Sequence, residues 1–382
     1  MPRQLHLSAA LDSPGRFDAG HYAALAGLAE RATLDFVTLD DSFTPEPGRP
    51  DALATLARIA PLTGRVGLVP TVTTTHTEPF HTSISVNTLD WVSKGRAGWL
   101  VGVSATDTEA KAFGRRPVAP ADELWAEAAD AVEVAARLWD SWEDDAEIRD
   151  TATGRFVDRD KLHYVDFEGR HFSVRGPSIT PRPPQGRPVV VLPVSASDLA
   201  PDASPGGRAR VAAAIRHADV VLLDAPDRAT RLSAATELRL RAGESLRILA
   251  RLDAALPVGT TGITDTTDTT GSDGSDGDAG TAGTDRAAEE RLLAELTATG
   301  TGVDGFHLVP ADPLRDLTAL ADRIAPALRA AGLLRPAYTG RTLRDHLGLD
   351  RPAGHYSTLP SSLAPAAAPV PAASPALAEV TR

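Results

Sequence analysis

Short apolar runs alternate with amphipathic stretches along most of this chain, and this alternation constrains the fold more than any other feature. Runs that suit strands lie at residues 5–9, 36–39, 66–72, 99–103, 188–194, 219–223, 246–252 and 305–309. Stretches with helical spacing lie between and after them, at residues 21–31, 51–61, 82–93, 120–142, 208–217, 228–241, 286–298 and 313–331. Strands that alternate with helices are typical of a parallel sheet with helices outside. About eight repeats predict an α/β fold of the TIM (β/α)8 barrel type.

The first turn supports a barrel over the other common parallel architecture. No Gly-x-Gly-x-x-Gly pattern follows the first predicted strand, so a dinucleotide-binding sheet is disfavoured. We expect one barrel domain over residues 1–352. Aromatic residues alternate around turns at 150–175, which indicates a β-hairpin insertion. Residues 259–284 are low-complexity and acidic, and we expect a disordered surface loop there; residues 353–382 are expected to form a disordered tail rich in Ala and Pro.

Composition excludes several classes of function. The chain has 39 Lys and Arg against 51 Asp and Glu, a formal net charge of −12, which disfavours nucleic-acid and anionic-membrane partners. It has no cysteine, which excludes disulfides and cysteine nucleophiles and fits a cytoplasmic location. No apolar run is long enough for a membrane span, and we expect no signal peptide. His163 and His171 lack the spacing of metal ligands, so no metal site is expected and a metal-dependent hydrolase is disfavoured.

Six segments, in this order, resemble one known family. They are GRAGW at 95–99, LWDSWEDDA at 138–146, GRFVDRDKLHYVDFEGRHFSVRGP at 154–177, RPPQGRPVVV at 182–191, DGFHLVP at 304–310 and YTGRTLRDHLGL at 338–349. Together they resemble the nitrilotriacetate and dibenzothiophene-sulfone monooxygenase branch of the bacterial luciferase-like flavin proteins. The resemblance covers roughly residues 5–352. It implies a TIM barrel, assembled as a homodimer, that binds reduced FMN from a separate flavin reductase and uses O2 to oxidise a small organic substrate.

The resemblance also implies a set of contact residues. The flavin carries the oxidation chemistry in such proteins, so no side chain is expected to act as a catalytic nucleophile. The positions that correspond to flavin contacts are Asp41, Thr73, Thr74, Ser104, Trp125 and Ser195. His76 takes the place of a tyrosine and is expected to face the substrate pocket. For Asp41 a role as a helix cap is an equal alternative, because it precedes a predicted helix.

Several positions depart from the family pattern toward side chains that cannot hydrogen-bond. An asparagine is replaced by Leu100, a threonine by Val103, and a histidine near the flavin phosphate by Ala121. Pro193 removes a backbone donor, and Val194 adds a Cβ where close approach to the phosphate is implied. These changes predict weakened flavin binding. The alternative is a catalytically inactive barrel of the same ancestry that acts as a subunit or binding protein.

Overall fold

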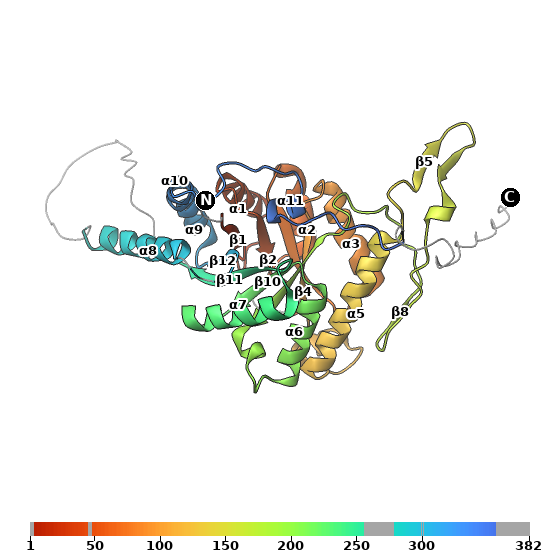
Figure 1. The fold of residues 1–382 in the computed structure, drawn as a ribbon, viewed down its shortest axis with the longest axis horizontal. Helices are drawn as coiled ribbons and strands as arrows, with labels where there is room; N and C mark the ends of the chain where they lie inside the picture. The colour runs from red at the N-terminus through yellow and green to blue at the C-terminus, as the bar shows by residue number, and fades with distance from the viewer. Residues whose placement is uncertain (1–3, 45–47, 256–278, 299, 301, 357–382) are drawn as a thin grey trace, which may run out of the picture.

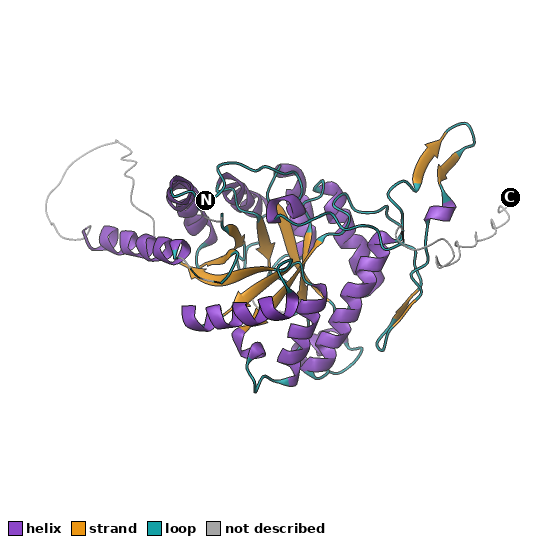
Figure 2. Cartoon of the chain, in the orientation of Figure 1, coloured by secondary structure: helices purple, strands orange, loops and turns teal. Residues whose placement is uncertain are grey.

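The computed structural model describes residues 4–44, 48–255, 279–298, 300 and 302–356. Eight parallel strands of the described chain close into a barrel in the order β1-β12-β11-β10-β9-β4-β3-β2, and helices surround it (Figures 1 and 2). The strands are β1 (His6–Ala10), β2 (Phe36–Leu39), β3 (Gly67–Thr73), β4 (Gly98–Gly102), β9 (Val189–Ser195), β10 (Val220–Asp224), β11 (Arg247–Ala254) and β12 (Gly305–Pro310). All eight predicted strands are present, with ends shifted by at most two residues, so the predicted TIM barrel is confirmed.

Helices follow the strands and bury one face against the sheet. Their bounds are α1 (Ala19–Arg31), α2 (Ala52–Ile59), α3 (Pro79–Val92), α4 (Asp107–Phe113), α5 (Ala121–Asp140), α6 (Pro205–His217), α7 (Arg228–Ala242) and α8 (Ala279–Thr297). Polar caps fix several starts: the side chain of Asp51 accepts the amide N–H of Ala54, and Thr106 and Glu109 form a reciprocal capping box. These caps set where the loops above the barrel end.

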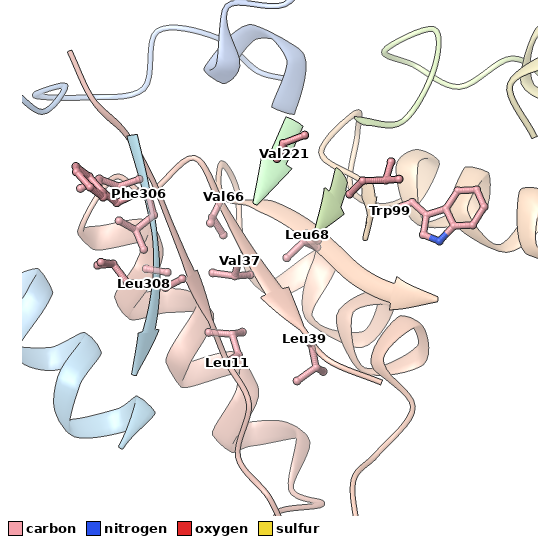
Figure 3. Close-up of a cluster of buried hydrophobic side chains, with 14 of the residues drawn as sticks. Leu11, Val37, Leu39, Val66, Leu68, Trp99, Val221, Phe306 and Leu308 are labelled. Atoms are coloured by element: carbon pink, nitrogen blue, oxygen red, sulfur yellow. The ribbon is translucent and has the colours of Figure 1, made fainter. Parts of the chain in front are cut away.

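The main hydrophobic core lies between the strands and the helices. Alternate residues along and beside the strands point outward into it, among them Leu11, Val37, Leu39, Val66, Leu68, Trp99, Val221, Phe306 and Leu308 (Figure 3). The residues between them point into the barrel. Because both faces of each strand are covered, the strands read as nearly continuous apolar runs in the sequence.

The amino-terminal end of the barrel is closed by the short helix α11 (Leu343–Leu347). Leu343 and Leu347 pack into the barrel interior with Phe36 and with valines and leucines of the strands. A Cβ on Gly67 would lie 2.7 Å from a methyl carbon of Leu343, so this close approach requires glycine. The lower half of the barrel is therefore a filled apolar floor.

The predicted insertion differs in detail from the structure. It contains two small antiparallel sheets instead of one hairpin, formed by β5 (Glu147–Asp150) with β6 (Arg155–Val157), and by β7 (Phe167–Glu168) with β8 (Ser173–Val174). A 3-10 turn, η2 (Arg159–Lys161), lies between the two pairs and separates them. The insertion projects from the barrel beside the carboxyl end of α5 (Figure 1).

The carboxyl-terminal part contains a second correction. The helix predicted over 313–331 consists of α9 (Pro313–Ala319), a π-helical turn, η4 (Leu320–Ile324), and α10 (Ala325–Ala330). Pro326 explains the interruption, since it lacks the N–H of a regular helix and crowds the preceding turn. The helix α8 begins at Ala279, earlier than the predicted Arg286. Of the predicted loop and tail, residues 259–278 and 357–382 lie outside the described residues.

Candidate functional site

A cavity of about 540 Å³ occupies the barrel interior at the carboxyl ends of the strands. Its wall is built from the inward-facing residues that follow the apolar floor, which is where parallel barrels carry their ligand sites. The cavity is open to solvent, because Asp40, Asp224 and Arg251 in its lining are exposed. Its volume lies in the range of small-molecule and cofactor sites.

Four of the seven predicted site residues line this cavity. They are Asp41, Thr73, Trp125 and Ser195. Asp41 follows β2, and one of its carboxylate oxygens accepts the amide N–H of Ala52 at 2.9 Å. Burial raises the pKa of Asp41 above its usual value. The capping role considered from the sequence is thus present, and it coexists with a place in the cavity wall.

Ser195 and Trp125 meet at one side of the cavity, next to helix α6. Ser195 ends β9, and its hydroxyl lies 2.9 Å from that of Ser197. The guanidinium of Arg210 lies 5.5 Å from the ring centre of Trp125 and forms a 2.6 Å ion pair with Asp198. This side therefore offers hydroxyls, an indole face and a guanidinium to a ligand.

The other three predicted residues lie near the cavity without lining it. The hydroxyl of Thr74 donates to the backbone carbonyl of Gly102 at 3.2 Å. Ser104 is buried, and its hydroxyl has no hydrogen-bond partner among the described residues. His76 has a left-handed backbone with φ of 67°, and its ring stacks on Phe113 at 4.9 Å. The flavin-contact roles of Thr74 and Ser104, and the substrate-pocket role of His76, stay predictions.

His76 combines several uncommon features. Left-handed backbone at a residue other than glycine costs energy and is often found at functional sites. Neither ring nitrogen has a hydrogen-bond partner in the described part of the chain. Burial lowers its pKa, and the charge of Arg116 lowers it further, so the ring is neutral near pH 7.

A second cavity, of about 390 Å³, adjoins the first over α3. The two share Asp41, Ser42, Thr71 and Thr73 in their walls. Phe113 also lines the second cavity, and because its ring stacks on His76, it separates that histidine from the cavity. Space for two adjacent ligands is therefore present around the end of β3.

The residues that depart from the family pattern are placed differently from one another. Leu100 lines the cavity and packs on the apolar floor, and Val103 and Pro193 also line the cavity. The side chain of Val194 is packed in the outer hydrophobic core, although the residue borders the cavity. Ala121 is exposed at the start of α5 and does not line the cavity.

The structure adds cavity residues that the sequence did not reveal. Thr71 lies beside Leu100 in the β3–β4 register, and its hydroxyl has no partner among the described residues. His307 on β12 lies opposite Arg251 on β11, and both line the cavity with Asp12. Alternation from a known interior position would have identified them, because side chains along a strand point to opposite faces in turn.

The pKa values of His307 and Asp12 lie far from the usual values of these side chains. Nδ1 of His307 lies 2.9 Å from the hydroxyl of Ser8, and burial together with the charge of Arg251 lowers the pKa of His307 to about 3. Burial raises the pKa of Asp12 to about 6. The cavity therefore holds a neutral imidazole and a carboxyl that titrates close to neutral pH.

Metal clusters and membrane-spanning helices are absent from the described part of the chain. No cluster of three or more His, Asp or Glu side chains there could hold a metal ion. None of the helices among those residues is both long and apolar enough to cross a membrane.

Solved structures of similar fold include monooxygenases and a lyase. A riboflavin lyase, crystallised with modified FMN and riboflavin, superposes with a TM-score of 0.75 at 22% identity, over 92% of this chain and 97% of the lyase. An EDTA monooxygenase from Chelativorans sp. BNC1 gives 0.73 at 20% identity, over 91% and 99%. At these identities the comparison establishes the fold.

Sequence comparison establishes the family. Nitrilotriacetate monooxygenase component A from Aminobacter aminovorans is 38% identical over 193 residues, 46% of this chain and 43% of that protein. N-acetyl-S-(2-succino)cysteine monooxygenase from Bacillus subtilis (strain 168) is 37% identical over 49% of this chain and 44% of its own length. The match thus spans less than half of either relative. Dibenzothiophene-sulfone monooxygenase from Rhodococcus erythropolis is 28% identical over 89% of this chain and 92% of its own. The family profile described as luciferase-like monooxygenase matches residues 4–268, and the chain belongs to that family.

Proposed function

We propose that this chain is a flavin-dependent monooxygenase that binds reduced FMN in the barrel cavity and oxidises a small organic substrate. The observation that carries the proposal is that the hydroxyls of Thr71 and Thr73 border a cavity of about 540 Å³ and have no hydrogen-bond partner among the described residues. A buried hydroxyl without a partner costs about 1–3 kcal/mol. Polar groups kept at such a cost are expected to pair with a bound ligand.

The residues present suit a flavin whose two ends face different sides of the cavity. The phosphate would lie near Ser195, Ser197 and Arg210, where hydroxyls and a guanidinium suit an anion. The ring would lie toward β3 and β4, with Thr71 and Thr73 at its polar edge and Leu100 beneath it. This placement would give partners to the two threonine hydroxyls that have none among the described residues.

The chemistry at this site belongs to the cofactor. Bound reduced FMN supplies two electrons for the activation of O2, so that one oxygen atom enters the substrate and the other leaves as water. The chain binds and orients both ligands and excludes water. Trp125 and Leu100 provide apolar wall, and His76, being neutral, can accept or donate a hydrogen bond at the substrate side once Phe113 moves away.

The name of one relative supports a proposal about a partner protein. One relative is named as component A of its monooxygenase, a name that indicates a system of more than one protein. We therefore propose that a separate flavin reductase supplies reduced FMN to this chain. From the family resemblance we also propose that the chain assembles as a homodimer. Light scattering on the purified protein would check the assembly, and a doubling of the monomer mass is the expected result.

We also propose that flavin binding is weaker than in relatives with an amide at position 100. Leu100 cannot pair with a polar flavin atom, and Pro193 in the same wall has no N–H. The inactive alternative, in which the barrel serves as a subunit or binding protein, draws on the same two residues. Binding experiments separate these possibilities.

The test uses the purified full chain with oxidised and, under anaerobic conditions, reduced FMN. We expect saturable quenching of flavin fluorescence, tighter binding of the reduced form, and tighter binding still in Leu100→Asn. Oxygen consumption coupled to a general flavin reductase then reports turnover with candidate substrates. If the folded wild type and the Leu100→Asn variant both fail to bind either form, the enzyme proposal is wrong and the non-catalytic alternative stands.

A further inference from the structure

One side of the cavity wall carries a carboxyl, an imidazole and a guanidinium group. In the closed strand order, β1, β12 and β11 are adjacent, and β9 lies on the opposite side from β1. The flavin-phosphate residues proposed above belong to β9 and the helices next to it. The side formed by β1, β12 and β11 carries Asp12, His307 and Arg251. It is therefore left free for the substrate when flavin occupies the side of β9, β4 and β3.

Arg251 is the side chain on this side of the wall that is best placed to bind a ligand. It projects from β11 into the cavity, is exposed, and makes no hydrogen bond or ion pair with the residues that the structure describes. Its five donors are thus available to a ligand. The other arginine among the described lining residues, Arg210, differs because it pairs with Asp198.

No group near Arg251 forms an ion pair with it among the described residues, although the charge of Arg251 does act on the Asp12 carboxyl. His307, the neighbour of Arg251 across the β11–β12 register, stays neutral because burial, together with the charge of Arg251, lowers its pKa. Its Nδ1 and Nε2 lie 2.9 and 3.4 Å from the hydroxyls of Ser8 and Thr38. Asp12 is the nearby acid, and it already accepts the backbone N–H of Asp40 at 2.7 Å. No oxygen of Asp12 lies within ion-pair distance of Arg251 among the described residues.

We infer that Arg251 receives an acidic group of the substrate, a carboxylate or a sulfonate. The guanidinium fork matches the two oxygens of such a group, and the apolar floor below suits the carbon skeleton. Asp12, Asp40 and Asp224 around the mouth repel further negative charge, so the site takes one acidic group and not several. The inference rests on the proposed function, because it assumes that flavin occupies the β9 side.

The test compares benzoate with benzamide, which have similar shape and differ in charge. Binding of each to the full chain is measured by calorimetry, both with and without saturating FMN. We expect benzoate to bind more tightly than benzamide, and Arg251→Gln to weaken benzoate about tenfold while leaving benzamide unchanged. Arg251→Lys should recover part of the loss, since it restores the charge without the fork. Asp12→Asn should strengthen benzoate binding, an effect of opposite sign.

The outcomes distinguish this inference from the proposed function. FMN affinity is measured separately for wild type and Arg251→Gln, and no change is expected. If wild type binds FMN but benzoate shows no saturable binding, or no dependence on Arg251, the inference is wrong and the proposed function remains. If Arg251→Gln weakens FMN and not benzoate, Arg251 serves the flavin phosphate and the inference is overturned. Arg251-dependent benzoate binding without any FMN binding would refute the flavin proposal alone.

Discussion

The hydroxyl of Thr73 gives the sharpest test of how this cavity works. It is buried and has no hydrogen-bond partner among the described residues, at the end of β3. Thr73→Val removes this hydroxyl and keeps the branched shape that suits a strand. The free protein no longer buries an unsatisfied polar group, which costs about 1–3 kcal/mol. We therefore expect the free energy of unfolding of the free protein to rise by about 1 kcal/mol or more.

The same substitution should weaken flavin binding. A hydrogen bond contributes a net 0.5–1.5 kcal/mol or so, which corresponds to a loss of affinity between about twofold and tenfold. Stability is measured by urea unfolding without flavin, and affinity by quenching of FMN fluorescence. A substitution that stabilises the free protein and weakens its ligand binding is the signature of a polar group held ready for a ligand.

Thr74→Val is the matched comparison, one residue further along. The Thr74 hydroxyl already donates to the carbonyl of Gly102, so its removal should lower the free energy of unfolding by about 1 kcal/mol and change flavin affinity less. If Thr73→Val destabilises the protein as much as Thr74→Val, the Thr73 hydroxyl is satisfied in the free protein and the reasoning fails. A stabilised Thr73→Val variant with unchanged flavin affinity would show that the hydroxyl serves another ligand.

Three further predictions concern stability. Burial raises the pKa of Asp12 from 3.8 to about 6, so the folded state loses stability as pH rises through that window. In urea unfolding, Asp12→Asn should raise the free energy of unfolding by up to about 3 kcal/mol at pH ~8 and leave it unchanged below pH ~4. Arg96 is buried, and its guanidinium donates to the backbone carbonyls of four surrounding loop and helix-end residues. Arg96→Met should therefore lower the free energy of unfolding by about 3 kcal/mol or more, and a thermal midpoint like that of the wild type would contradict this. Burial lowers the pKa of His217 from 6.5 to about 4, so stability is lost as pH falls through that range, and His217→Gln should flatten the acid side of the stability profile.

The repeat pattern of the sequence was enough to place the strands. Apolar runs bounded by polar ends are unambiguous when helices separate them, and the predicted run at 36–39 matches β2 residue for residue. Interruptions within a helix were harder to predict, because helix propensity does not indicate how the backbone accommodates a residue such as proline. Pro326 could end, kink or bulge a helix, and in the structure a π-helical turn over Leu320–Ile324 precedes it.

The site was predictable only in part. Asp41, Thr73 and Ser195 line the cavity, since strand ends in a barrel converge there, and their contacts with flavin stay predictions. Thr71 and Arg251 were missed, because strands covered on both faces show no alternation that marks the inner side. The stacking of Phe113 on His76 joins α4 to the loop after β3, and a contact between separate loops has no local signal in the sequence.

Leu100 acquires a different meaning once its neighbours are known. In the sequence it is an apolar residue in place of an amide, and this replacement predicts a weakened site. In the barrel it continues the apolar floor formed by Phe36, Val69 and Val191. Thr71 is next to it on the adjacent strand, and its hydroxyl has no hydrogen-bond partner in the described part of the chain. The polar group that β4 does not provide can therefore be supplied by β3, one strand away. On this reasoning Thr71→Val should reduce flavin affinity more in the wild type than in Leu100→Asn, where the introduced amide can pair with the flavin instead.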